Sequence, residues 1–376
     1  MIRRSFFILM ALLPLVAGAE PAEKGVEELA SLGATANGAV KPSLTPLASE
    51  LLGEGGAPAL PSLDQSADQS LADFALPLPA DLPESDIPLA MNDKVARFVQ
   101  HFQTNGREVF SRWLSRSERY IPSMREVLRQ RGLPEDLVYL AMIESGFAPD
   151  AYSCARAAGP WQFMPQTAKG FSLRIDPWID ERRDPVKSTV AAAMYLKELY
   201  VLFDQDWYLA AAGYNAGENK VLRAIRRYKS RDFWKLAERS YLKRETRDYV
   251  PKLLAAAIIA KEPAKYGFAD VAYLTPIEFD TVTIPEQTDL EVVARLCNVS
   301  EETIRELNPE ILLWCTPPNS DNYELKIPKG SRQAFLDAYG QLSPGERYSE
   351  RLIFSRYRVK RGESLKSLAR KFGTTT

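Results

Sequence analysis

Helical spacing dominates residues 93–268 and leaves room for few folds other than an all-helical one. Apolar residues recur there every three or four positions, the spacing of one helix face. The pattern begins with Val95, Phe98, Val99 and Phe102. Almost nothing in this stretch alternates with period two, as a half-buried strand would. The sequence therefore predicts an all-helical domain over 93–268.

Residues typical of helix starts and ends divide this domain into segments. Gly132 suits the end of one helix and Pro134 the first turn of the next, while Asp184 followed by Pro185 is typical of a helix start. The resulting expectation is helices at 94–103, 106–116, 118–131, 134–145, 185–203, 206–213, 217–228, 231–238 and 245–261.

The residue counts exclude several classes of enzyme. The chain has one histidine, His101, and three cysteines. A Ser-His-Asp or Cys-His hydrolase could be built only around His101, and zinc sites of the usual kinds lack ligands. We therefore expect chemistry that rests on carboxylates, with no metal and no cofactor.

The first nineteen residues have the pattern of an export signal. Arg3 and Arg4 precede an apolar run over 6–16, and Ala17-Gly18-Ala19 provides small residues for cleavage. Eleven apolar residues are too few for a membrane helix, which needs about 20. We expect residues 1–19 to be a signal peptide and the mature protein to be periplasmic, without a membrane span. Outside the cytoplasm Cys297 and Cys315 could form a disulfide or remain isolated, and the sequence leaves both possibilities open.

Residues 20–92 differ in composition from the helical domain after them. The segment is rich in Ala, Leu, Pro and Ser, and residues 20–93 hold thirteen acidic residues against Lys24 and Lys41. So few large side chains cannot offset the entropy of ordering the chain. We expect a disordered acidic linker over 20–92. The remaining body carries a net charge of +8, which suits a polyanionic wall better than it suggests nucleic acid.

After Gly267 the pattern changes to short β-prone pieces. Strands are predicted at 279–284 and 323–327, bracketing helices at 289–297 and 300–307, which makes a β-α-α-β unit within 272–330. A second copy starts within 355–376, where Tyr357-Arg-Val-Lys-Arg-Gly-Glu-Ser-Leu365 is followed by further apolar residues. Either this copy is truncated or the last twenty residues form half a module.

One carboxylate falls on the apolar face of the helix predicted at 134–145. Leu137, Leu140, Ala141 and Glu144 share one stripe. Burial and the negative end of the helix dipole would both raise the pKa of Glu144. A carboxylic acid that stays protonated near neutral pH can protonate a glycosidic oxygen. The alternative is an ordinary glutamate turned towards solvent.

Two glycine-bounded turns lie downstream of this helix. Gly159-Pro-Trp-Gln-Phe-Met-Pro165 and Gly213-Tyr-Asn-Ala-Gly217 combine aromatic and amide side chains. Sugars offer hydroxyl and acetamido groups together with apolar ring faces, which such side chains complement. Each turn alone is also typical of plain core packing.

Taken together with Glu144-Ser145 and Glu245-Thr-Arg-Asp-Tyr249-Val-Pro251, these motifs resemble the lysozyme-like, soluble-type (SLT) lytic transglycosylases. Within that family they are most similar to the membrane-bound transglycosylase D group, over 93–268. The pattern departs at Gly213, where alanine is usual, and at Pro160. No cysteine lies near the predicted cleavage site, so lipid anchoring there is not expected. The unit at 272–330 similarly resembles a degenerate LysM module, and 355–376 resembles the start of a second one.

The resemblance implies a mainly α, lysozyme-like catalytic domain followed by LysM modules. It also implies a peptidoglycan lytic transglycosylase that cuts the MurNAc-β-1,4-GlcNAc linkage and leaves 1,6-anhydro-MurNAc ends. Glu144 would act as general acid and then as general base. Ser145, Gln162, Met164, Tyr214, Asn215 and Tyr249 would line the substrate site, with Glu245 in a structural role. We expect a monomer whose partner is the glycan strands of the wall.

Two other functions remain open from the sequence. One is a lysozyme-type hydrolase on the same fold, in which Asp176, Asp180 or Asp184 positions a water molecule. The other is a wall-binding protein in which the LysM modules bind glycan and the helical domain is a scaffold. The first LysM-like unit could itself be a spacer without affinity for glycan.

Overall fold

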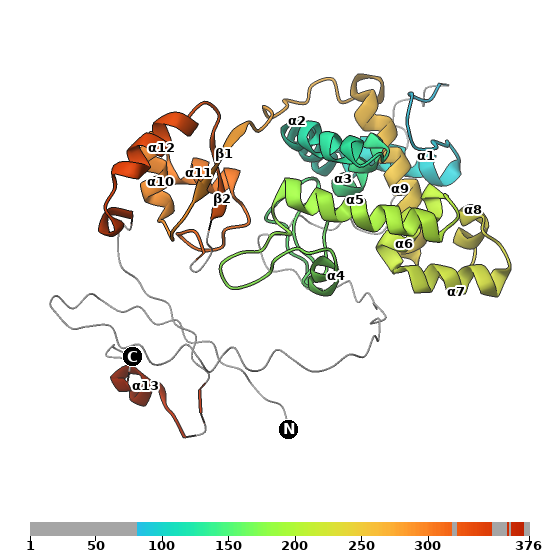
Figure 1. The fold of residues 1–376 in the computed structure, drawn as a ribbon. Coiled ribbons are helices and arrows are strands. Elements are labelled where there is room, and N and C mark those ends of the chain that lie inside the picture. Colours follow the sequence, from blue (N-terminus) through green and yellow to red (C-terminus); the bar gives the residue numbers. More distant parts are fainter. Residues whose placement is uncertain (1–80, 318–321, 348–358, 361, 372–376) are drawn as a thin grey trace.

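The computed structural model describes residues 81–317, 322–347, 359–360 and 362–371. The predicted signal peptide and linker residues 20–80 lie outside these ranges. Within them the protein is mainly α, as predicted, with one two-stranded sheet in the described part of the chain. A larger helical body and a smaller body that contains the sheet lie side by side (Figure 1).

The larger body is built from nine α-helices and two short 3₁₀ turns among the described residues. These are α1 (Asp93–Gln103), α2 (Arg107–Gln130), η3 (Glu135–Val138), α3 (Tyr139–Ser145), α4 (Pro165–Gly170), α5 (Pro185–Leu202), α6 (Trp207–Ala216), α7 (Glu218–Tyr228), α8 (Phe233–Ala237), α9 (Arg244–Lys261) and η4 (Pro263–Tyr266).

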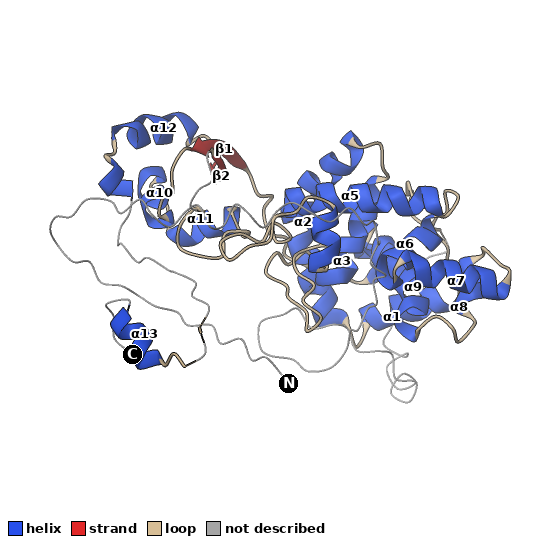
Figure 2. Ribbon diagram, turned by 60° about the horizontal axis from the view of Figure 1, so that its bottom comes forward, coloured by secondary structure: helices blue, strands red, loops and turns tan. Residues whose placement is uncertain are grey.

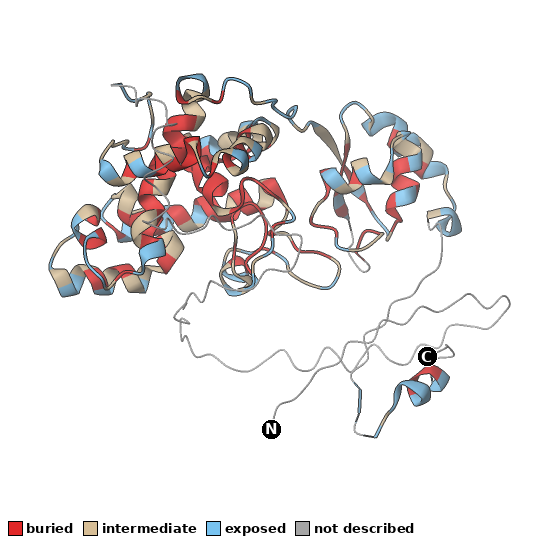
Figure 3. Ribbon diagram, turned by 180° about the vertical axis from the view of Figure 1, so that it is seen from behind, coloured by how far each residue is buried: buried red, intermediate tan, exposed pale blue. Residues whose placement is uncertain are grey.

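Helix α9 lies at the centre of this body. It packs against α1, α3, α6 and α8, and every residue from Leu253 to Ile259 is buried. A helix that is apolar on all sides is stable in water only when other elements enclose it. The buried residues accordingly gather along the middle of the helical body (Figure 3). Helix α3, which carries Glu144, is held against this central helix.

Residues 146–184, between α3 and α5, contain little regular structure. They include the short helix α4 and isolated bridges that pair Tyr152 with Ala158, Ala158 with Phe163, and Ile175 with Asp180. This segment carries the predicted turn at 159–165. Its conformation therefore depends on side chains that bond to backbone groups rather than on a helix or a sheet.

Two predicted helix boundaries are wrong. The helices expected at 106–116 and 118–131 form one continuous helix, α2. Buried Ser117 lies at the predicted break, but its hydroxyl donates to the carbonyl of Leu114 within the helix. The helix expected at 134–145 begins as the 3₁₀ turn η3, where the Asp86 carboxylate accepts bonds from the amides of Glu135 and Asp136.

The last twelve residues of the predicted linker 20–92 are described, and contacts with the helical body begin at Ser85. Ile87 is buried in the main core. Asp136 is buried and bonds to the Ser85 hydroxyl, to Arg125 and to Lys261. Burial alone would raise the pKa of Asp136, but the bonds from Lys261 and Ser85 outweigh it and the pKa is lowered. The composition of the segment does not predict this contact, because only a few of its residues make it.

The smaller body is the expected β-α-α-β unit. Strand β1 (Phe279–Ile284) pairs antiparallel with β2 (Tyr323–Pro328), with Phe279 opposite Pro328 and Ile284 opposite Tyr323 (Figure 2). Helices α10 (Leu290–Cys297) and α11 (Glu301–Leu307) lie between the strands in sequence. Cys297 and Cys315 are separate thiols rather than a disulfide.

The unit extends beyond its predicted end at residue 330. Helix α12 (Arg332–Gln341) contributes buried Phe335 and Tyr339 to the same core. Of the second module expected at 355–376, the described part includes the short helix α13 (Leu365–Lys371), while the predicted strand around Tyr357 lies mostly outside the described residues. In the described ranges, no helix is both long and apolar enough to cross a bilayer.

Gly146 ends α3 directly after the Glu144-Ser145 pair, and we expect its substitution to destabilise the protein strongly. It adopts a left-handed conformation with φ of 59°, and a Cβ atom there would lie 2.0 Å from Cδ1 of Trp113. Gly146→Ala should therefore lower the free energy of unfolding by about 3 kcal/mol or more, because strain adds to a steric clash.

Gly132 provides the matched control, since it is also left-handed, with φ of 66°, but has open space where its Cβ would lie. Gly132→Ala should cost only about 1 kcal/mol in urea unfolding. Equal losses in the two variants would contradict the clash with Trp113.

Candidate active site

Glu144 occupies the position that the apolar stripe predicts. Leu137, Leu140 and Ala141 of the stripe are buried, and Glu144 is half-buried one residue before the end of α3. Helix α3 packs directly on α9. The carboxyl group is thus carried into the protein by the hydrophobic residues of its own helix.

Tyr249 of α9 makes the contact that defines the site. Its hydroxyl donates to Oε1 of Glu144 at 2.6 Å. Burial raises the pKa of Glu144 to about 7, while the bond from Tyr249 acts in the opposite direction. Burial and the charge of Glu144 raise the pKa of Tyr249 well above its usual value, so this hydroxyl remains a donor. With Oε1 engaged by Tyr249, Oε2 is left to carry the exchangeable proton.

Two charged residues of α9 also act on Glu144. Lys252 lies one helical turn after Tyr249, and its charge lowers the pKa of Glu144, whereas exposed Glu245 raises it. Burial in turn lowers the pKa of Lys252. Sequence reasoning missed Lys252, although its i, i+3 spacing from Tyr249 placed both on one helix face. The structural role expected for Glu245 stays a prediction.

The turn predicted at 213–217 is wrong, because Gly213 to Ala216 form the end of helix α6. Tyr214 links this helix to the 159–165 loop. Its hydroxyl donates to the carbonyl of Trp161 at 2.8 Å, and its ring lies against Phe163 and Tyr195. Burial and the charge of Glu144 raise the pKa of Tyr214 well above its ordinary value. The charge of Glu144 therefore reaches two predicted site residues, Tyr214 and Tyr249.

Three other predicted residues take different positions. Ser145 is buried, and its hydroxyl donates to the carbonyl of Pro160 at 2.8 Å, so it fastens the 159–165 loop rather than facing outward. The amide of Gln162 turns back to the carbonyls of Gly159 and Ala151. Met164 is half-buried at the start of α4.

Asn215 joins two helices. Its Oδ1 accepts a bond from the hydroxyl of Thr246 at 2.9 Å, which ties α6 to α9. The departure at Gly213 has a packing reason, because a Cβ there would approach Cε2 of Phe203 to 2.6 Å. Phe203, at the end of α5, fills the space that an alanine methyl group would need.

The acids that a hydrolase would need are engaged elsewhere. Asp176 accepts bonds from Arg174 and from the amides of Trp178 and Ile179. The other two form buried ion pairs, Asp180 with Arg182 and Asp184 with Lys326. These contacts give all three carboxylates structural roles.

Comparison with known families identifies both bodies of the protein. A model described as the transglycosylase SLT domain matches residues 123–237. This stretch of the chain is therefore similar to an SLT domain. The LysM-like domain of lytic transglycosylase MltD matches residues 278–344, and a LysM domain matches 357–376. The SLT match spans Glu144, the 159–165 loop and Tyr214, but ends before Tyr249.

Individual proteins resemble this chain over longer stretches. Membrane-bound lytic murein transglycosylase D of Escherichia coli K12 is 31% identical over 295 residues, which cover 76% of this chain and 64% of that protein. The same figures hold for its counterpart in strain O6:H1. The chain thus spans somewhat less than two thirds of these relatives. Lytic transglycosylase Slt of Pseudomonas aeruginosa, a solved structure, is 25% identical over 41% of this chain and 24% of its own, with a TM-score of 0.33.

The raised pKa of Glu144 predicts how stability depends on pH. The folded pKa of about 7 exceeds the ordinary 4.5, so the folded state holds the proton more tightly between these values. This contribution to stability is present below pH 4.5 and is lost as the pH rises through 7. Glu144→Gln should therefore be more stable than the wild type at pH 8, on the order of 1–3 kcal/mol, and nearly equal to it at pH 4.

Urea unfolding at both pH values measures this difference. Glu198→Gln is the matched control, because it removes the same charge from an exposed position on α5, and it should show no such pH dependence. If Glu144→Gln raised the free energy of unfolding equally at pH 4 and pH 8, the result would contradict a raised pKa of Glu144.

Proposed function

We propose that this chain is a peptidoglycan lytic transglycosylase that cleaves the MurNAc-β-1,4-GlcNAc linkage and forms 1,6-anhydro-MurNAc ends. The observation that carries the proposal is the Glu144 carboxyl, raised to a pKa of about 7 by burial and held at Oε1 by the Tyr249 hydroxyl. The SLT and LysM-type domains support a substrate in the cell wall. We further propose that the protein acts in the periplasm as a monomer and associates with the wall.

The reaction needs only one carboxyl group. Protonated Glu144 donates its proton to the glycosidic oxygen as the bond from MurNAc C1 to that oxygen breaks. The carboxylate then accepts the proton of the MurNAc C6 hydroxyl, whose oxygen bonds to C1. Glu144 ends in its starting state, and no water is consumed. A pKa near 7 suits a group that must both give and receive a proton.

Hydrolysis on the same fold is a weaker candidate. Two-carboxylate hydrolysis needs a second acid that acts as nucleophile or positions water, at a defined distance from the first. Asp176, Asp180 and Asp184, the candidates for that role, are engaged by cations and backbone amides. Because these three carboxylates already have partners, the intramolecular attack by the C6 hydroxyl is favoured over hydrolysis.

Glu144→Gln tests the proposed chemistry. The variant keeps an acceptor for the Tyr249 hydroxyl but has no proton to give, so release of anhydro-muropeptides should fall at least 10³-fold. Mass spectrometry of digested peptidoglycan measures this directly, with Glu198→Gln expected to match the wild type.

The same spectra separate the three candidate functions. Anhydro ends support the transglycosylase, whereas reducing ends would indicate hydrolysis. Binding without any release by the wild type would indicate a wall-binding protein. Retained activity in Glu144→Gln would remove Glu144 from the mechanism.

Tyr249→Phe tests the hydrogen bond to Glu144. The active form of Glu144 is protonated, so kcat/KM should fall as the pH rises through about 7. The bond from Tyr249 lowers the pKa of Glu144, so its loss should move this fall to higher pH, by about 0.5–1 unit. The pH profile of kcat/KM measures the shift.

Tyr273→Phe is the control for this variant, because Tyr273 is an exposed tyrosine outside the site. Its profile should coincide with that of the wild type. A profile of Tyr249→Phe that moves to lower pH would mean that the hydroxyl stabilises the protonated carboxyl instead.

A further inference from the structure

The LysM-like domain is joined to the SLT domain through residues 176–184. The amide of Asp180 donates to the carbonyl of Glu310 at 2.9 Å, and the amide of Leu312 donates to the carbonyl of Trp178 at 2.8 Å. Ile179, which lies between them, is fully buried in the hydrophobic core of the LysM-like domain. Ile179 of the catalytic domain therefore forms part of the core of the LysM-like domain. A flexible spacer would not make such a contact.

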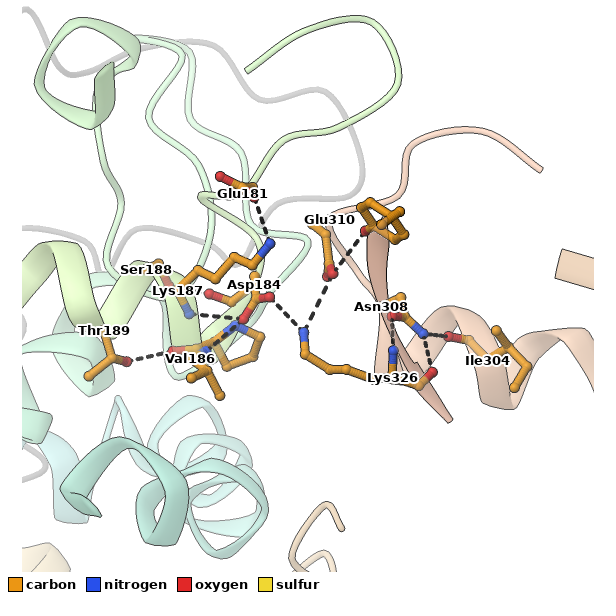
Figure 4. Close-up of polar contacts among 12 residues, drawn as sticks. Glu181, Asp184, Val186, Lys187, Ser188, Thr189, Ile304, Asn308, Glu310 and Lys326 are labelled. Atoms are coloured by element: carbon orange, nitrogen blue, oxygen red, sulfur yellow. Dashed lines mark hydrogen bonds and ion pairs between the residues drawn. The ribbon is translucent and has the colours of Figure 1, made fainter. Parts of the chain in front are cut away.

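A buried cluster of three charges lies beside this contact (Figure 4). Lys326 of β2 places Nζ 2.6 Å from Oδ2 of Asp184 and 3.5 Å from Oε1 of Glu310. All three residues are less than a tenth exposed. Burial alone would lower the pKa of Lys326, but the two carboxylates raise it, so the cation persists. Lys326 thus lies between two buried carboxyl groups: its charge lowers the pKa of Asp184 despite burial, whereas burial raises the pKa of Glu310.

Asp184 connects this cluster to the catalytic domain. Its second oxygen, Oδ1, caps α5 by accepting bonds from the amides of Val186 and Lys187 at 2.8 and 3.0 Å. The buried side chain of Arg182, two residues earlier, donates to the carbonyl of Phe163 at 2.9 Å. Lys326 therefore fixes the position of Asp184, which caps α5 and lies two residues after Arg182.

The 159–165 loop rests on the same segment. The indole of Trp161 donates to the hydroxyl of Thr189 on α5 at 2.8 Å. Gly159 approaches so closely that a Cβ there would lie 1.7 Å from the carbonyl oxygen of Arg182. The other side of the loop is bonded to Ser145 and Tyr214, beside Glu144. An unbroken series of packed and hydrogen-bonded groups thus runs from Lys326 to the residue next to the catalytic acid.

We propose that Lys326 is a positioning residue for the reaction: through Asp184, the LysM-like domain holds the 159–165 loop in place beside Glu144. This inference rests on the proposed transglycosylase function. It gives the LysM-like domain a part in the chemical step that does not require any affinity of its own for glycan.

Lys326→Met tests the proposal in the full chain, because it removes the charge and keeps the length of the side chain. The substrate is soluble, uncross-linked glycan strands. We expect kcat to fall at least tenfold while KM changes less than threefold. Hydrogen exchange should quicken at least tenfold at the amides of Gln162 and Phe163, which are bonded within the loop.

Lys329→Met is the matched control. Lys329 directly follows β2 and pairs with Asp280, but its side chain is 64% exposed. Its kcat and its exchange rates at Gln162 and Phe163 should equal those of the wild type. A loss in this variant as large as that in Lys326→Met would overturn the proposal.

Asp184→Asn carries the test if Lys326→Met does not fold. Asparagine is also a good helix cap, so this variant keeps the start of α5 and loses only the charge that Lys326 meets. We expect the same fall in kcat and the same faster exchange. The double variant Asp184→Asn/Lys326→Met should lose less than the product of the two single effects, because both act through one contact.

The two readouts separate this proposal from the proposed function. If the wild type forms no anhydro product, the proposed function fails, and the exchange rates still decide whether Lys326 holds the loop. Unchanged exchange and unchanged kcat in a folded Lys326→Met or Asp184→Asn variant would overturn the positioning role. Faster exchange with unchanged kcat would overturn it as well.

Discussion

The desolvation of one carboxyl group is the constraint on which the rest of the structure depends. Glu144 is carried by an apolar helix face onto α9, and the cost of burying its charge appears as a pKa of about 7. Tyr249 and Lys252 reduce that cost without removing it. A fully solvated glutamate would be ionised at neutral pH and would hold no proton to donate. A glutamate in a strong ion pair would also be ionised.

A site of this kind needs rigid surroundings, yet the segment that faces Glu144 has little helix or sheet. Its order comes from side chains bonded to backbone carbonyls. Arg182 holds Phe163, Tyr214 holds Trp161, and Ser145 holds Pro160. Such bonds define a single conformation while leaving the outer atoms of the loop available for contacts with a ligand. The buried ion pairs of the segment, Asp180 with Arg182 and Asp184 with Lys326, serve this architecture.

The sequence predicted features that depend on neighbouring residues but not contacts between residues far apart in the chain. The stripe of Leu137, Leu140 and Ala141 placed Glu144 correctly, because helix periodicity is encoded within a few residues. Tyr249 came from a resemblance rather than from spacing, and the structure brings it to Glu144. The pairing of Asp184 with Lys326 joins residues 142 positions apart. No periodic pattern specifies such a pair, since each partner alone has the features of a surface charge.

The contacts of Asp136 bear on where the helical body begins. Composition suggests a boundary at residue 93, but Ser85 and Asp86 supply bonds to the turn that starts the Glu144 helix. A fragment cut at residue 93 would leave Asp136 with its cations but without its hydroxyl partner, and η3 without its carboxylate cap. The smallest piece that retains the native surroundings of the acid therefore begins upstream of Ser85, inside what composition marks as linker.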